Sequence, residues 1–260
     1  MPYRVYEDFV AGINAGRSRV QPIFGNIPAT TTATPFAASF ISWQKIGYTR
    51  AFPTPLPGGV TGYVVTEVAT GISGTAVGSV LVAKLVNFGN LDISGASGTW
   101  TDGSQMPTVT ELGASVQVAS SIMGVVTTSL NATPGTFTVT YVDQNGNAAE
   151  ACAAITPTAS TLAGSGGIIR LNSGDWGARD ITTAARQAGT TPTGVITFYG
   201  LIPICMIPCH NTTAGVITKQ NVLSGLMNAY RFGAGDTIGF FATGNASKGL
   251  MGHLTVLGDN

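Results

Sequence analysis

The stretch Phe137-Thr138-Val139-Thr140-Tyr141-Val142-Asp143-Gln144-Asn145-Gly146-Asn147 indicates which class of fold this chain adopts. Phe137, Val139 and Tyr141 alternate with other residues in the period-two pattern of a half-buried strand. The Asn145-Gly146 pair that follows predicts a tight hairpin turn with positive φ at both residues. Residues 148–155 are then expected to return as the second strand.

Similar short runs rich in Val, Thr, Ile and aromatic residues occur on both sides of this hairpin, separated by glycine-rich turns. They cover residues 60–68, 79–87, 116–128, 167–171, 193–204, 237–243 and 249–257. A chain of many short strands predicts an all-β fold, and we expect a β-sandwich with jelly-roll-like topology. No repeat of about 20–50 residues is evident, which argues against a solenoid or a propeller.

The first 57 residues differ in composition from the rest of the chain. Six prolines between Pro22 and Pro57, together with the run Thr30-Thr31-Thr32, predict an extended N-terminal arm over residues 1–57. The sandwich domain is then expected over residues 58–260. Apolar spacing also predicts one or two short helices, over residues 3–15 and 221–230.

The chain carries very little charge. Charged residues make up 9% of its 260 residues, 12 basic and 12 acidic, against about 25% in ordinary soluble domains. A compact monomer of this size exposes about 10,700 Å², so each charge serves about 445 Å² instead of about 165 Å². Because such a surface at zero net charge favours association, we expect much of it to be buried against other subunits. The alternative is a soluble protein that its many threonines keep in solution.

Composition also argues against several partners. Zero net charge and a single basic doublet, Arg17-Ser18-Arg19, predict no nucleic-acid binding. No stretch of about 20 apolar residues lacks Gly, Pro or several Thr, so no membrane span is expected. Acidic residues Glu7 and Asp8 occupy the place of an apolar export segment, so we expect synthesis in the cytoplasm without export.

Neither metal binding nor catalysis is predicted. Cys205, Cys209 and His210 form the most metal-like cluster, but on a strand the two cysteines would lie about 13 Å apart. We therefore expect small apolar cysteines and no metal ion or other cofactor. Only His210 and His253 are available as imidazole bases and no Gly-x-Ser-x-Gly is present, so the chain is not expected to be an enzyme.

Two stretches resemble virion proteins of tailed bacteriophages. The first is Gly135-Thr136-Phe137-Thr138-Val139-Thr140-Tyr141-Val142-Asp143-Gln144-Asn145-Gly146. The second is Leu171-Asn172-Ser173-Gly174-Asp175-Trp176-Gly177-Ala178-Arg179-Asp180-Ile181, which is similar to a Gly-Asp-x-Gly-x-Arg element and precedes an apolar segment over residues 196–208. The similarity covers roughly residues 130–257.

The resemblance implies a capsid-decorating, or cement, protein on the surface of a phage virion. Its partners would be the major capsid protein and neighbouring copies of itself, and we expect a homo-oligomer, with a trimer as the hypothesis. The residues expected to contact these partners are the cationic Arg17, Arg19 and Arg50 and the aromatic Phe24, Phe36 and Trp43.

Two other functions remain open. The chain could be another virion component, such as a coat, tail or baseplate protein. It could also be a carbohydrate-binding β-sandwich or adhesin, a class that places exposed aromatic rings beside Asp and Asn in a shallow site. For that function the sequence points to Trp100-Thr101-Asp102 and to Asp175-Trp176.

Overall fold

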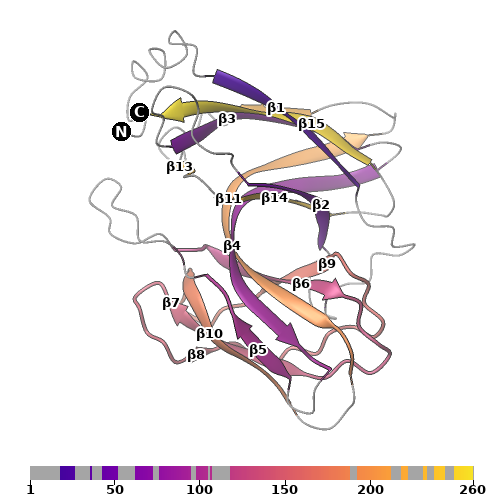
Figure 1. The fold of residues 1–260 in the computed structure, drawn as a ribbon, viewed down its shortest axis with the longest axis vertical. Helices are drawn as coiled ribbons and strands as arrows, with labels where there is room; N and C mark the ends of the chain where they lie inside the picture. Colours follow the sequence, from indigo (N-terminus) through magenta and orange to yellow (C-terminus); the bar gives the residue numbers. More distant parts are fainter. Residues whose placement is uncertain are drawn as a thin grey trace. The chain divides into compact units, whose positions relative to one another are not determined.

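The computed structural model shows two compact units (Figure 1). It describes residues 18–26, 36, 43–51, 62–72, 76–94, 98–104, 106, 118–187, 192–211, 218–221, 231–232, 237–243 and 249–259. The first unit is Met1–Ala29, Ile46–Lys84 and Pro203–Asn260, and the second is Thr30–Lys45 and Leu85–Ile202. All helix or strand structure among the described residues is β-strand.

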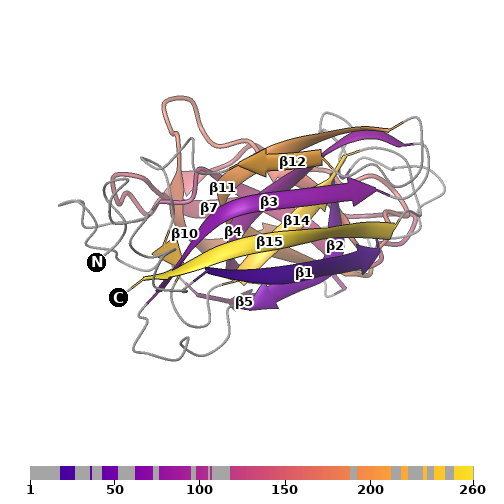
Figure 2. The ribbon, with the colours of Figure 1, turned by 90° about the horizontal axis from the view of Figure 1, so that it is seen from above.

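In the first unit, an antiparallel sheet has the strand order β1-β15-β3-β12 (Figure 2). These strands are β1 (Ser18–Asn26), β15 (Gly249–Asp259), β3 (Gly62–Ile72) and β12 (Thr218–Asn221), and β13 (Arg231–Phe232) also pairs with β3. A further strand, β14 (Thr237–Ala242), has five consecutive buried residues after its first. Near its end, the Thr243 amide donates a 2.9 Å hydrogen bond to the Ser79 carbonyl of β4 (Ala76–Asp92).

In the second unit, one sheet has the order β10-β7-β8, with all pairs antiparallel. Its strands are β10 (Ala178–Arg186), β7 (Phe137–Asp143) and β8 (Glu150–Ala151). Facing this sheet, β11 (Val195–Asn211), β6 (Ser121–Thr128) and β9 (Ser165–Ile169) lie side by side, and Trp43 and Gln44 of β2 (Trp43–Ala51) pair with β9. β5 (Thr99–Asp102) forms a hairpin with the end of β4.

Aromatic side chains fill the space between the sheets of the second unit. The Phe137 ring of β7 lies 5.9 Å from the Phe198 ring of β11 and 6.3 Å from Phe36, measured between ring centroids. All three rings are fully buried. Burial along β7 alternates strictly, as the sequence predicts. Two sheets that share one apolar core form a sandwich, so the all-β fold class is confirmed.

Neighbouring strands in these sheets are mostly non-consecutive in the chain, as the connections of jelly-roll-like folds require. The runs predicted around residues 60–68, 79–87, 193–204 and 249–257 correspond to β3, β4, β11 and β15. The strands β1, β2, β5, β10, β12 and β13 were not predicted as strands. The helix predicted over residues 3–15 lies outside the described residues, as does 222–230, while Asn221 ends β12.

The turn after β7 differs from the prediction. Gly146 has a φ of 95°, but Asn145 does not share this positive φ, so the two-residue turn with positive φ at both residues is wrong. Instead, the Asp143 carboxylate accepts hydrogen bonds from the amides of Asn145 and Asn147, both at 2.8 Å. An aspartate side chain that accepts hydrogen bonds from the amides of the following turn can stabilise a connection wider than a two-residue turn. The return strand is correspondingly short, limited to β8 and an isolated bridge between Phe137 and Ile155.

Part of the predicted arm belongs to sheets of its own chain. All nine residues of β1 pair with β15, from Ser18 opposite Leu257 to Asn26 opposite Gly249. Trp43 and Gln44 pair with Gly166 and Ser165. The boundary between arm and sandwich at residue 57 stays a prediction.

Candidate functional site

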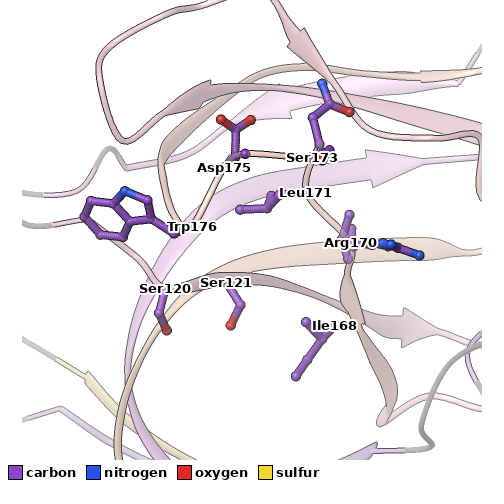
Figure 3. Close-up of a pocket in the computed structure, with 11 residues that line it drawn as sticks. Ser120, Ser121, Ile168, Arg170, Leu171, Ser173, Asp175 and Trp176 are labelled. Carbon is purple, nitrogen blue, oxygen red and sulfur yellow. The ribbon is translucent and has the colours of Figure 1, made fainter.

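The loop between β9 and β10 borders a surface pocket of about 430 Å³ in the second unit (Figure 3). The pocket is lined by residues 168–176 of this loop and its entry strand, and by Ser120 and Ser121 at the start of β6. Trp176 and Arg170 lie at opposite ends of it (Figure 3). The Trp176 side chain is 66% exposed, and Ile168 is 38% exposed.

The buried Tyr141 hydroxyl makes two hydrogen bonds to the middle of this loop. It donates a 2.6 Å hydrogen bond to Oδ2 of Asp175 and accepts a 2.8 Å hydrogen bond from the Asn172 amide. Tyr141 is fully buried, in the central strand β7. Burial and the neighbouring Asp175 carboxylate raise the pKa of Tyr141 well above its ordinary value, so its hydroxyl keeps its proton. The hydrogen bond to a carboxylate is of the stronger, charge-assisted kind and ties the loop to β7.

Gln144 provides a second anchor from the turn after β7. Its side-chain Oε1 accepts hydrogen bonds from the amides of Trp176 (3.2 Å) and Gly177 (3.3 Å), and its Nε2 donates to Oδ1 of Asp175 (3.3 Å). Nη2 of Arg179 donates a 2.7 Å hydrogen bond to the Gln144 carbonyl. Residues 135–146 and 171–181 are therefore hydrogen-bonded to each other through Tyr141, Gln144, Asp175 and Arg179.

The acidic turn residue Asp143 stays ionised beside this site. Burial opposes its charge, but hydrogen bonds from Asn147 and Asn145 outweigh burial and lower the pKa of Asp143 below its ordinary value. Asn147 contributes twice, through its amide at 2.8 Å and its Nδ2 at 2.7 Å. The Asp143 carboxylate therefore stabilises the turn through its hydrogen bonds to Asn145 and Asn147.

The structure places the predicted contact residues as follows. Arg17 lies outside the described residues, and Arg19 and Phe24 lie in β1, while Trp43 and Arg50 lie in β2. Only the backbone of these strands is described at those four positions.

Phe36 has a position different from the one expected for a partner contact. Its ring is fully buried between Phe137 and Gly124, and its carbonyl accepts a 3.0 Å hydrogen bond from the Thr158 amide. A partner could reach this ring only if the core of the second unit opened.

The two tryptophans proposed for a carbohydrate site do not share one pocket. Trp100 is half-buried in β5 and packs on Phe198, with 5.8 Å between ring centroids. Trp176 lies in the pocket beside Asp175. The sequence pointed to Asp175-Trp176 but not to Ser120, Ser121 and Arg170, because no local pattern relates these three residues to this loop.

No group of three or more His, Cys, Asp or Glu side chains is placed to hold a metal ion within the described part of the chain. Burial raises the pKa of the Cys205 thiol to about 12 and raises that of Cys152, so neither is a ready thiolate ligand or nucleophile. Cys209 and His210 lie in β11, where only their backbone is described. The described residues also include no helix of the length and apolar character needed to cross a membrane.

Comparison with known proteins gives no family for this chain. No family model matches it, and no curated protein matches it. Among solved structures, the human polyomavirus 6 VP1 pentamer is 9% identical and aligns over 93% of this chain and 94% of that chain, with a TM-score of 0.20. The VP2 subviral particle of infectious bursal disease virus is 7% identical over 94% of this chain and 81% of that chain, with a TM-score of 0.18. TM-scores this low do not establish a shared fold.

Proposed function

We propose that this chain is a non-enzymatic virion structural protein that binds a capsid shell and stabilises it as a decoration, or cement, protein. The observation that carries the proposal is the uncharged outer face of the sheet β10-β7-β8. The resemblance of residues 130–257 to tailed-phage virion proteins supports the same function. The proposed location is the capsid surface of a phage virion, beside the major capsid protein and other copies of this chain, arranged as a trimer.

The outer face of this sheet carries hydroxyl and methyl groups. Alternation along β7 turns Thr138, Thr140 and Val142 outward, and all three are half-exposed. Their neighbours on the same face are Thr183 and Ala185 of β10 and Ala151 of β8, all exposed. Asp180 lies opposite Val142 but is only 5% exposed. Such a surface can be covered by another protein at little cost, because no ionised group loses its water.

Moreover, several of the few charged side chains are buried in the protein. Lys84 and Asp143 are 2% exposed, and Asp180 and Arg186 are 5% exposed. The surface therefore carries fewer ionised side chains than the 24 in the sequence. A surface depleted of charge is typical of interface cores.

A lysine in the centre of the outer face should prevent attachment. We expect Thr140→Lys to lower the copy number of this chain on virus particles by about tenfold or more, because the buried ammonium would lose its water without gaining a partner. The measurement is quantitative mass spectrometry of particles purified from cultures that produce the chain. Thr128→Lys is the matched control, since Thr128 is also exposed and lies at the end of β6 in the other sheet.

Two outcomes would overturn this proposal. One is the absence of the wild-type chain from purified particles. The other is an unchanged copy number for Thr140→Lys, with the thermal unfolding of the variant showing that it is folded.

The cationic residues of the N-terminal segment give an independent test of the proposed contacts. We expect Arg17→Glu with Arg19→Glu to abolish attachment and leave the isolated fold intact, because the reversed charges would repel carboxylates on the shell. Arg50→Glu should weaken attachment in the same direction. Full occupancy of particles by the double variant would remove these arginines from the contact.

A further inference from the structure

The pocket beside the β9–β10 loop has an exposed aromatic ring, Trp176, at its edge. Among the large apolar side chains that the structure describes, Trp176 is the most exposed at 66%, ahead of Met206 at 52%, Leu162 at 44% and Ile168 at 38%. An indole ring held in water at the edge of a pocket is an unused contact surface, since tryptophan stabilises a fold mainly when it is buried.

The backbone that carries this ring is held in place before any ligand arrives. The Trp176 amide is bonded to Oε1 of Gln144, and the adjoining Asp175 carboxylate is bonded to both Tyr141 and Gln144. The next amide, of Gly177, is bonded to the same Gln144 oxygen. A ring on a fixed backbone loses little conformational freedom when it binds, which raises affinity.

The rest of the pocket wall combines polar side chains with the apolar Ile168 and Leu171. Ser121, Ser173 and Arg170 line it together with Trp176, and Arg170 lies at the end opposite the ring (Figure 3). Hydroxyl and guanidinium groups donate hydrogen bonds to ligand oxygens. A pocket of about 430 Å³ is at the small end of the range for small-molecule sites.

We propose that this pocket is a saccharide-binding site in which a pyranose ring stacks on Trp176 and its hydroxyls bond to the serine side chains, with Arg170 at the opposite end placed for a carboxylate. A pyranose has an apolar face of C–H groups and a rim of hydroxyls, which matches one aromatic surface bordered by polar groups. A protein partner fits less well, because the pocket wall is about half polar, whereas the buried core of a protein interface is more apolar. This inference goes beyond the proposed virion function and does not depend on it.

The test uses the whole chain with soluble sugars as probes. Methyl α-D-glucopyranoside, methyl α-D-galactopyranoside, N-acetylglucosamine and galacturonate are each titrated, and the Trp176 indole N–H is followed by NMR. We expect at least one probe to bind with a dissociation constant of about 1 mM, as is usual for a ligand of this size on a shallow site. Saturation-transfer NMR should show the strongest contact at the C–H face of the sugar.

Substitutions of single residues test whether sugar binding depends on stacking against Trp176. We expect Trp176→Ala to weaken binding about fivefold or more and Trp176→Phe to retain most of it, because the smaller ring still stacks. Met206→Ala removes another exposed apolar side chain outside the pocket and should bind as the wild type does. Arg170→Gln distinguishes the sugar class: it should weaken galacturonate binding if the carboxylate is recognised and leave the neutral glycosides unaffected.

Three results would overturn the proposal. The first is no binding of any probe at about 20 mM, well above the expected dissociation constant. The second is binding that Trp176→Ala leaves unchanged. The third is a loss of self-association in Trp176→Ala, measured by sedimentation, with no sugar bound, which would make Trp176 a protein contact. A circular dichroism melt of each variant shows that it is folded.

Discussion

At the scale of single residues, Tyr141 connects the core of the second unit to the candidate site. Its ring contributes to the core of the second unit and its hydroxyl holds the loop that carries Trp176. The hydroxyl has two partners, Asp175 and the Asn172 amide, which lie 34 and 31 residues away in sequence. One buried polar atom thus joins the sheet to the pocket.

Tyr141→Phe should destabilise the protein while preserving its shape. We expect a loss of about 1–3 kcal/mol in the free energy of unfolding, because the Asn172 amide and the Asp175 carboxylate lose a common partner. Urea unfolding followed by circular dichroism measures this loss. A free energy equal to that of the wild type would show that water replaces the hydroxyl without cost.

The same residue predicts how stability depends on alkaline pH. The pKa of Tyr141 is raised in the folded protein, so the unfolded chain releases this proton first, near its ordinary value of 10.0. The resulting stability is present below that pH and is lost as the pH rises above it. We expect the wild type to lose more stability than Tyr141→Phe between about pH 9 and pH 11, measured by urea unfolding at each pH. Equal losses would contradict the prediction.

At the scale of elements, the hairpin of β4 and β5 depends on a close backbone approach at Gly89. Gly89 has a φ of 126° and lies opposite Asp102. A Cβ at this position would overlap the Thr101 carbonyl oxygen and lie 2.8 Å from the Trp100 ring. Only glycine provides both this φ and this closeness.

Gly174 offers a matched comparison for this hairpin. It has a φ of 101°, but a Cβ there would meet nothing within 4 Å. We therefore expect Gly174→Ala to cost about 1–3 kcal/mol from backbone strain alone. Gly89→Ala should cost clearly more, because steric overlap adds to the same strain. Thermal unfolding of the two variants measures the difference, and equal melting temperatures would show that the hairpin relaxes around the new methyl group.

At the scale of the whole molecule, the low charge of the chain makes association the main expectation. The pairing of β1 with β15 places residues 18–26 in a sheet of the same chain. The case for association therefore rests on the neutral surface rather than on an arm that reaches out. The outer face of β10-β7-β8 is the proposed place for it.

Sedimentation equilibrium at micromolar concentration tests this expectation directly. We expect a species heavier than the 26.5 kDa monomer, with a threefold mass for the proposed trimer. Added salt should change the mass little, since contacts between uncharged surfaces are weakly screened. A monodisperse monomer that stays in solution would contradict the argument from charge.

The sequence by itself determined the all-β class and the alternation of β7. Successive side chains of a strand point to opposite faces of the sheet, so a period-two apolar pattern shows which residues are buried. The sequence also named Asp175-Trp176 and Trp100-Thr101-Asp102 as places to look for an exposed aromatic ring beside an acid, of which Trp176 is exposed and Trp100 is half-buried. It missed the wide turn after β7, where the Asp143 side chain competes with ladder pairing.

Only the tertiary structure decided that the start of β6 and the β9–β10 loop border one pocket, and that Phe36 lies in the core against Phe137. These contacts depend on which distant strands pair. That choice is made by the packing of the whole core, and no local pattern in the chain encodes it.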